Sequence, residues 1–203
     1  MKTYRRLFVI SLCLFLVVAT TTVAYATIQT DGVSITGVRQ AKSEWCWAAS
    51  AQIAGKCVYP SSSRTQYSIV NHLKGATAGT SEEMYPNESG SLSDSVAGSE
   101  YMTYGNVDFR STYSKWGYSE IVTSLVRGYP VQAAAGYYNW IIREGGHMVV
   151  IYMTQFIDNS DGSWMNLYYY DPWDGETHCC TYEAFCDASY NGRKYDQTVY
   201  VAQ

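Results

Sequence analysis

The spacing of hydrophobic positions changes about halfway along the chain. The Ala-rich stretch Glu44–Gly55 lacks Pro and internal Gly, and Tyr67, Val70 and Leu73 follow three residues apart, as on one face of a helix. From about residue 106, apolar and polar positions begin to alternate, which is typical of strands with one buried face. The pattern therefore predicts a helical first half followed by a sheet.

These patterns predict the individual elements. Helices are expected over Glu44–Gly55, Arg64–Leu73, Leu92–Tyr104 and Ser119–Arg127, the last capped by Ser119 and ended by Gly128. Strands are expected over Pro130–Tyr138, His147–Ile157, Trp164–Tyr170 and Gln197–Ala202, with an extended arm over Thr27–Gly37, an exposed loop over 75–91 and a hairpin turn over Asp158–Gly162. Helices first and an antiparallel sheet second predict one α+β domain in two halves, with a groove between the halves as the natural site.

The N-terminus has the pattern of a secretory signal peptide. Three basic residues lie within the first six positions, an apolar stretch runs from Leu7 to Ala19, and Ala24-Tyr25-Ala26 matches the small-x-small cleavage pattern. We therefore expect a signal peptide over residues 1–26 and one domain over residues 27–203. The alternative is an uncleaved membrane anchor.

Composition narrows the class of protein. Hydrophobic residues make up 47% of the 203 residues and charged residues only 16%, so the chain can bury a core and is not a disordered segment. The net charge is −4, no basic run is present, and removal of the signal peptide takes away three basic residues. Nucleic acid is thus excluded as a partner. We expect a secreted, extracellular monomer that is not membrane-bound after signal removal.

The cysteine count points to one chemically distinct thiol. Five cysteines remain after the signal peptide, and an odd number in a secreted chain leaves at least one thiol unpaired. We expect one or two disulfides, of undetermined pairing, among Cys57, Cys179, Cys180 and Cys186. A zinc site built on His178 and its neighbouring cysteines is disfavoured, because two adjacent cysteines rarely chelate one ion. No metal or cofactor is expected.

Cys46 is the candidate nucleophile. It lies at the start of the first predicted helix, where unpaired backbone N–H groups and the helix dipole stabilise a thiolate. On the residues alone, a buried structural cysteine is an equal alternative. The segment from Gln40 to Cys46, followed by Trp47-Ala48-Ala49, resembles the active-site segment of papain-like cysteine peptidases. In that superfamily a Gln six positions before the Cys donates to the oxyanion, and the resemblance implies this role for Gln40.

His147 is the candidate base. It follows Gly145-Gly146 and begins an apolar strand, and this arrangement resembles the Gly-His strand that carries the catalytic His of the same superfamily. His72 lies on a polar helix face and is interpreted as a surface residue. A base of this kind needs a partner that orients its ring.

Asp171 is the candidate orienting residue. It ends the predicted strand that lies across the hairpin turn from His147, and Pro172 follows it. A Gly-His strand followed by an Asp-Pro strand end resembles the compact secreted and bacteriocin-leader-processing branches of the superfamily. Asp174 is the nearest competitor for the role.

The resemblance implies a fold and an activity. The fold is papain-like, with an N-terminal helical half whose nucleophile helix packs on a C-terminal antiparallel sheet. The activity is hydrolysis of peptide bonds in a peptide or protein substrate, by a Cys-His-Asp triad and a thioester acyl-enzyme. The sequence departs from papain in carrying Ser43-Glu44-Trp45 where Gly-Ser-Cys usually precedes the nucleophile, and in having no room for a long prodomain between Ala26 and Gln40.

Two alternatives remain open. The same triad would also serve an acyl transferase of the transglutaminase or ligase kind, in which an amine rather than water releases the acyl group. A non-catalytic secreted binding module on this fold is the other alternative, and the Gln40, Cys46, His147 and Asp171 set argues against it because binding does not need that set.

Overall fold

The structure, a computed structural model, describes residues 26–75, 85–139, 142–187 and 192–202. The predicted signal peptide, Ala26 apart, and part of the predicted loop over 75–91 lie outside these residues. Within the described ranges, no helix combines the length and the apolar character needed to span a membrane.

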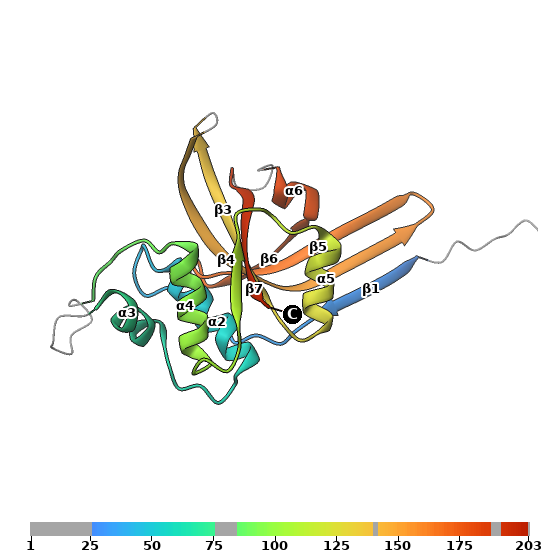
Figure 1. The fold of residues 1–203 in the computed structure, drawn as a ribbon. Helices are drawn as coiled ribbons and strands as arrows, with labels where there is room; N and C mark the ends of the chain where they lie inside the picture. Colours follow the sequence, from blue (N-terminus) through green and yellow to red (C-terminus); the bar gives the residue numbers. More distant parts are fainter. Residues whose placement is uncertain (1–25, 76–84, 140–141, 188–191, 203) are drawn as a thin grey trace, which may run out of the picture.

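The described residues form an α+β fold with a seven-stranded antiparallel sheet and five helices (Figure 1). The helices are α2 (Cys46–Val58), α3 (Gln66–Lys74), α4 (Leu92–Met102), α5 (Tyr118–Val126) and α6 (Tyr182–Cys186). The strands are β1 (Thr27–Gly32), β2 (Phe109–Thr112), β3 (Val131–Asn139), β4 (Ile142–Asn159), β5 (Gly162–Asp171), β6 (Glu176–Thr181) and β7 (Lys194–Val201).

The sheet order is β2-β7-β3-β4-β5-β6, and β4 is its longest strand. The first part of β4 pairs with β3, as in Ala135 opposite His147, and the last part pairs with β1, as in Thr27 opposite Asp158. On its other side β4 pairs with β5 through the predicted hairpin turn, which Asn159 and Gly162 close. The predicted extended arm is thus partly a strand of the sheet.

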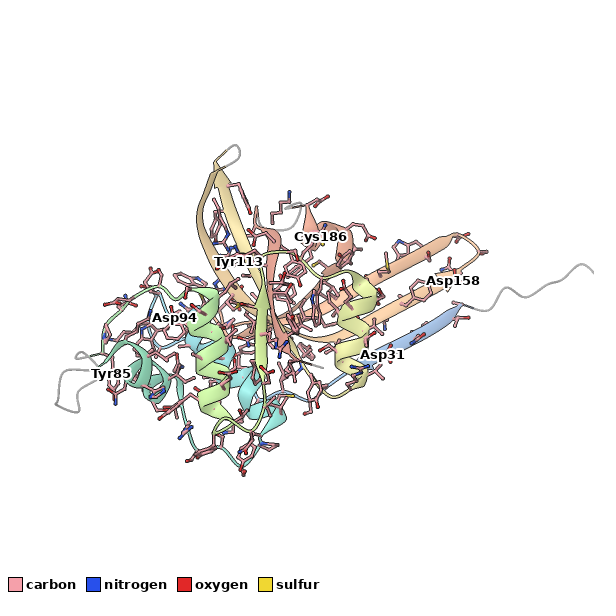
Figure 2. All side chains as sticks on the ribbon, in the orientation of Figure 1. Asp31, Tyr85, Asp94, Tyr113, Asp158 and Cys186 are labelled. Carbon is pink, nitrogen blue, oxygen red and sulfur yellow. The ribbon has the colours of Figure 1, made fainter. Side chains whose placement is uncertain are left out.

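The core is divided between the two faces of the sheet. One cluster lies among α2, α3 and α4 and includes Trp45, Trp47 and Met102, and α2 also packs on the sheet through Ile53 and Ala54. A separate cluster covers the other face under α5 and α6 (Figure 1). Figure 2 shows Cys186, on α6, at this second face. The predicted α+β class, with helices packed on an antiparallel sheet, is confirmed.

Several predicted boundaries differ from the structure, two of them for an identifiable reason, and two short elements were not predicted. The first helix continues through Gly55 to Val58, because Gly55 is the point where α2 contacts Met102 of α4 and not a helix stop. The helix expected from Ser119 starts at Tyr118 and is capped by Gly117, whose N–H donates to the Glu120 carboxylate at 2.6 Å. Strand β6 and helix α6 were not predicted, because their short, Cys- and Thr-containing segments carry no clear periodicity.

The cysteines beyond the predicted signal peptide all have free thiols in the structure. The expected disulfides among Cys57, Cys179, Cys180 and Cys186 are therefore not formed in the part of the chain described. Burial raises the pKa of Cys57 to about 11 and that of Cys180 to about 12, so both thiols are held in their protonated form at neutral pH.

Candidate active site

Cys46 lies at the start of α2, as predicted, and is its first residue because the helix begins two residues after the predicted Glu44. Its backbone N–H therefore belongs to the helix turn that lacks internal acceptors. The flanking Trp45 and Trp47 are almost completely buried. Their indole N–H groups donate to backbone carbonyls, Trp45 to Pro86 at 2.9 Å and Trp47 to Glu88 at 3.1 Å. Because buried indole N–H groups need acceptors, these two bonds fix segment 85–91 beside the N-terminus of α2.

His147 lies on β4 and is only 6% exposed. Its Nε2 is 2.5 Å from Oδ1 of Asp171, the last residue of β5. The Cys46 thiol is a second hydrogen-bond partner of the ring, and since Nε2 faces Asp171, the nitrogen left for the thiol is Nδ1. The structure thus brings the three predicted triad residues together in the order Cys46, His147, Asp171.

Asp171 is held by more than His147. The same Oδ1 accepts the backbone N–H of Trp173 at 2.8 Å, and Oδ2 lies 3.6 Å from Nη1 of Arg193. These contacts fix the carboxylate at the end of the strand, where it can orient the imidazole ring. The competitor Asp174 pairs instead with His178, at 2.8 Å.

The surroundings of His147 and Asp171 favour the charged forms of both side chains. Burial acts to lower the pKa of His147, but hydrogen bonds to Asp171 and Cys46 outweigh burial and raise the pKa to about 9. Burial raises the pKa of Asp171, but the hydrogen bonds from His147 and from the Trp173 N–H outweigh burial and hold the pKa of this carboxyl below its ordinary value. At neutral pH the His147 ring is therefore held as an imidazolium beside the sulfur of Cys46.

Gln40 lies in the loop before α2, and its backbone N–H donates to the carbonyl of Pro172 at 2.8 Å. This bond ties the loop to the strand end that carries Asp171. The Gln40 amide nitrogen donates to the carbonyls of Lys42 and Ser43 at 2.9 and 2.8 Å, and its Oε1 is buried with no partner among the described residues. The oxyanion role of Gln40 stays a prediction, since it requires one of these amide hydrogens to be released or shared.

The structure adds a buried support that the sequence did not indicate. Gln66, at the start of α3, donates to the carbonyl of Arg39 and accepts the N–H of Ala41, both at 2.9 Å. Its own backbone N–H donates to Gln52 of α2 at 2.6 Å. A glutamine at a helix start carries no sequence signal for this function, because the contact exists only once α3 has packed against the loop around Gln40.

A cavity of about 330 Å³ opens over Cys46 and His147. One wall is the segment 89–92 before α4, and the other comes from β3, β4 and β7. The groove expected between the two halves is thus present. Sequence reasoning missed Arg143 and Gln197, which line it, because neither residue lies in a motif.

One cluster has ligand types suitable for a metal ion, namely Asp171, Asp174 and His178, whose ligand atoms lie within 4.8 Å of one another. Its groups already have partners. Asp171 Oδ1 is bonded to His147 and Trp173, and Asp174 accepts from His178 and from the Glu176 N–H at 2.9 Å. These side chains therefore form hydrogen bonds within the protein.

The remaining histidines have other partners. His72 stacks on Tyr101, with ring centroids 4.2 Å apart, and His178 pairs with Asp174. His147 is therefore the histidine that meets Cys46. Comparison with models of known protein families finds no match for this chain, and comparison with curated proteins finds none either.

Proposed function

We propose that this protein is a cysteine peptidase that hydrolyses peptide bonds through Cys46, His147 and Asp171. The observation that carries the proposal is the ring of His147, which contacts the Cys46 thiol on one side and the Asp171 carboxylate on the other, at the floor of an open cavity. A thiol, a base and an orienting carboxylate in this order are the components of nucleophilic acyl transfer.

The chemistry follows from the positions of these groups. The Cys46 thiolate attacks the peptide carbonyl carbon, forming a carbon–sulfur bond, while its own backbone N–H faces the developing oxyanion. The His147 imidazolium gives its proton to the leaving amine as the carbon–nitrogen bond breaks. Water then attacks the acyl carbon while the neutral ring takes a proton from it, and cleavage of the carbon–sulfur bond releases the acid product and restores the Cys46 thiolate beside the His147 imidazolium. Asp171 holds the ring throughout and stabilises its positive charge.

Thiol labelling tests the proposal. An irreversible thiol-directed peptidase inhibitor is added to the protein at near-neutral pH, and adducts are located by intact mass and peptide mapping. We expect one fast adduct on Cys46, with the rate lost in His147→Ala. The His72→Ala variant is the control, and it should keep the rate. Slow labelling of several cysteines that is equal in wild type and His147→Ala would refute the proposal.

The participation of Gln40 is tested separately. Loss of one oxyanion donor typically lowers kcat by about 10²–10³. We therefore expect Gln40→Ala to lower peptide hydrolysis by about that factor while Cys46 labelling continues. An unchanged kcat would remove Gln40 from the proposed machinery and leave the triad untouched.

We also propose that the enzyme acts after export. The basic, apolar and small-residue pattern of residues 1–26 supports this. Expression with the full N-terminus should yield extracellular protein whose first residue is Thr27. Protein retained in the membrane fraction with an intact N-terminus would support the anchor alternative instead.

A further inference from the structure

Arg143 is a second functional group on the wall of the cavity. It lies on β4, four residues before His147, next to a break in the strand register. Tyr137 pairs with Gly145 and Tyr138 pairs with Arg143, which leaves residue 144 as the extra residue of a β-bulge. Bulges re-aim side chains and are frequent beside active sites. Here the bulge puts Arg143 on the same face of the sheet as Gly146.

Two paired glycines make room for the guanidinium group. Gly136 and Gly146 are directly opposite each other on β3 and β4. A Cβ at Gly146 would lie 2.3 Å from Arg143 Nη2, and a Cβ at Gly136 would lie 2.7 Å from Arg143 Nε. Any side chain at either position would displace the group. The bare backbone is therefore the surface on which the guanidinium lies, in the cavity that His147 also lines.

Arg143 is anchored by Asp196 and Tyr138. Its Nε donates to Oδ2 of Asp196 at 2.8 Å, and the same oxygen accepts the Tyr138 hydroxyl. Tyr138 is also a side-chain hydrogen-bond partner of Arg143, and the Arg143 side chain is 31% exposed. A guanidinium held through Nε presents its two terminal nitrogens as a fork whose geometry matches a carboxylate.

Among the residues that the structure describes, the charged side chains that line the cavity are all basic. Arg143 and His147 are the charged side chains that line it, and no described carboxylate does so. The chain as a whole carries a net charge of −4. A positive cavity on an acidic protein attracts negative ligand groups and repels positive ones.

From this arrangement we infer that the cavity selects substrates with a carboxylate close to the scissile peptide bond, and that Arg143 is the residue that binds this carboxylate. The inference rests on the proposed peptidase function. The carboxylate has two possible sources, an acidic side chain and the free C-terminus of a short peptide. Both present the same planar pair of oxygens to the guanidinium.

The first test reads the charge of the cavity without peptide hydrolysis. Iodoacetate and iodoacetamide alkylate the same thiol and differ mainly in charge. We measure the rate of Cys46 alkylation by iodoacetate divided by the rate with iodoacetamide, in wild type and in Arg143→Gln. The ratio should fall at least about threefold in the variant, and high salt should reduce the wild-type ratio. The double variant Arg143→Gln/Asp196→Asn removes both charges and guards against misfolding caused by an unpaired Asp196.

A matched arginine serves as the control. Arg110 also donates through Nε to an aspartate, Asp108 at 3.2 Å, but it lies outside the cavity over Cys46. Arg110→Gln should leave the rate ratio at its wild-type value. An equal change in Arg110→Gln and Arg143→Gln, or no change in either Arg143 variant, would overturn the inference.

The second test reads specificity. Peptide pairs carry Glu or Gln at each position around the cleaved bond, and each peptide is made with a free or an amidated C-terminus. In wild type, kcat/KM should be at least about tenfold higher for Glu than for Gln at one position, or for the free than for the amidated C-terminus. Arg143→Gln should remove this difference. Equal kcat/KM for all pairs in wild type would refute the inference while leaving the peptidase intact. Loss of His147-dependent labelling would instead refute the peptidase proposal.

Discussion

The Asp171→Asn variant tests the electrostatic design of the site most directly. Asparagine keeps an oxygen for the His147 Nε2–H and for the Trp173 N–H, so the geometry is retained and the negative charge is lost. The pKa of His147 should therefore fall from about 9 toward its ordinary value of 6.5. In the variant, the contact with Cys46 still raises the pKa of His147 and burial of the ring still lowers it.

The size of the effect follows from the same numbers. One pKa unit corresponds to about 1.36 kcal/mol, so a rise from 6.5 to about 9 favours the charged ring by about 3 kcal/mol in the folded protein. Because the folded-state pKa is the higher one, the folded state holds the proton more tightly than the unfolded state. This stabilisation is complete below pH 6.5 and is lost as the pH rises through about 9.

Two assays follow the change. An NMR titration of the His147 ring gives its pKa in wild type and in Asp171→Asn, and thermal unfolding between pH 6 and 9.5 gives the stability. We expect the alkaline loss of stability to be smaller in the variant, and the alkaline limit of Cys46 labelling to move to lower pH. Asp174→Asn is the control, because Asp174 pairs with His178 and should not affect His147.

The reasoning fails if His147 titrates near 6.5 in the wild-type protein. It also fails if Asp171→Asn and Asp174→Asn shift its pKa equally. In either case Asp171 would orient the ring without stabilising its charge.

Three further variants probe the supports of the site. Gln66→Ala should lower the free energy of unfolding by about 2 kcal/mol in chemical denaturation, because it removes a buried side chain and its two part-buried hydrogen bonds to the loop around Gln40, whereas the exposed Gln29→Ala should change it by less than about 0.5 kcal/mol. Gly55→Ala should destabilise the protein by about 1–2 kcal/mol despite the better helix propensity of alanine, because its Cβ would lie 2.3 Å from Met102 Cβ; a rise in melting temperature would contradict this. Gly90→Ala would place a Cβ 2.3 Å from the indole ring of Trp47, which lines the cavity, and Cys46 labelling should slow severalfold. An unchanged labelling rate would contradict this prediction.

The sequence predicted which three residues lie together better than it predicted their surroundings, for a physical reason. Cys46, His147 and Asp171 each follow a local pattern, namely a helix start, a Gly-Gly-His strand and a strand end before proline. The contacts of Gln66 and Arg143 have no local pattern, because they arise only when distant elements pack together. Such contacts are visible in a structure and not in a single sequence.

The same distinction explains the errors at glycines. Gly128 has a φ of +89° and ends α5, as its position predicted. Gly55 lies inside α2 because the helix crossing with α4 needs a residue without a side chain. A sequence shows that a glycine is present, but whether it serves backbone conformation or close packing is decided by a partner elsewhere in the chain.

The position of β7 has a consequence for how the protein is made. This strand follows every other strand along the chain, yet it lies inside the sheet between β2 and β3 and contributes Gln197 to the cavity. During vectorial synthesis or translocation, the sheet therefore stays open until the final strand emerges. The cavity around Cys46 is then completed only after β7 has emerged, so a product truncated before Lys194 lacks the part of the wall that Gln197 supplies.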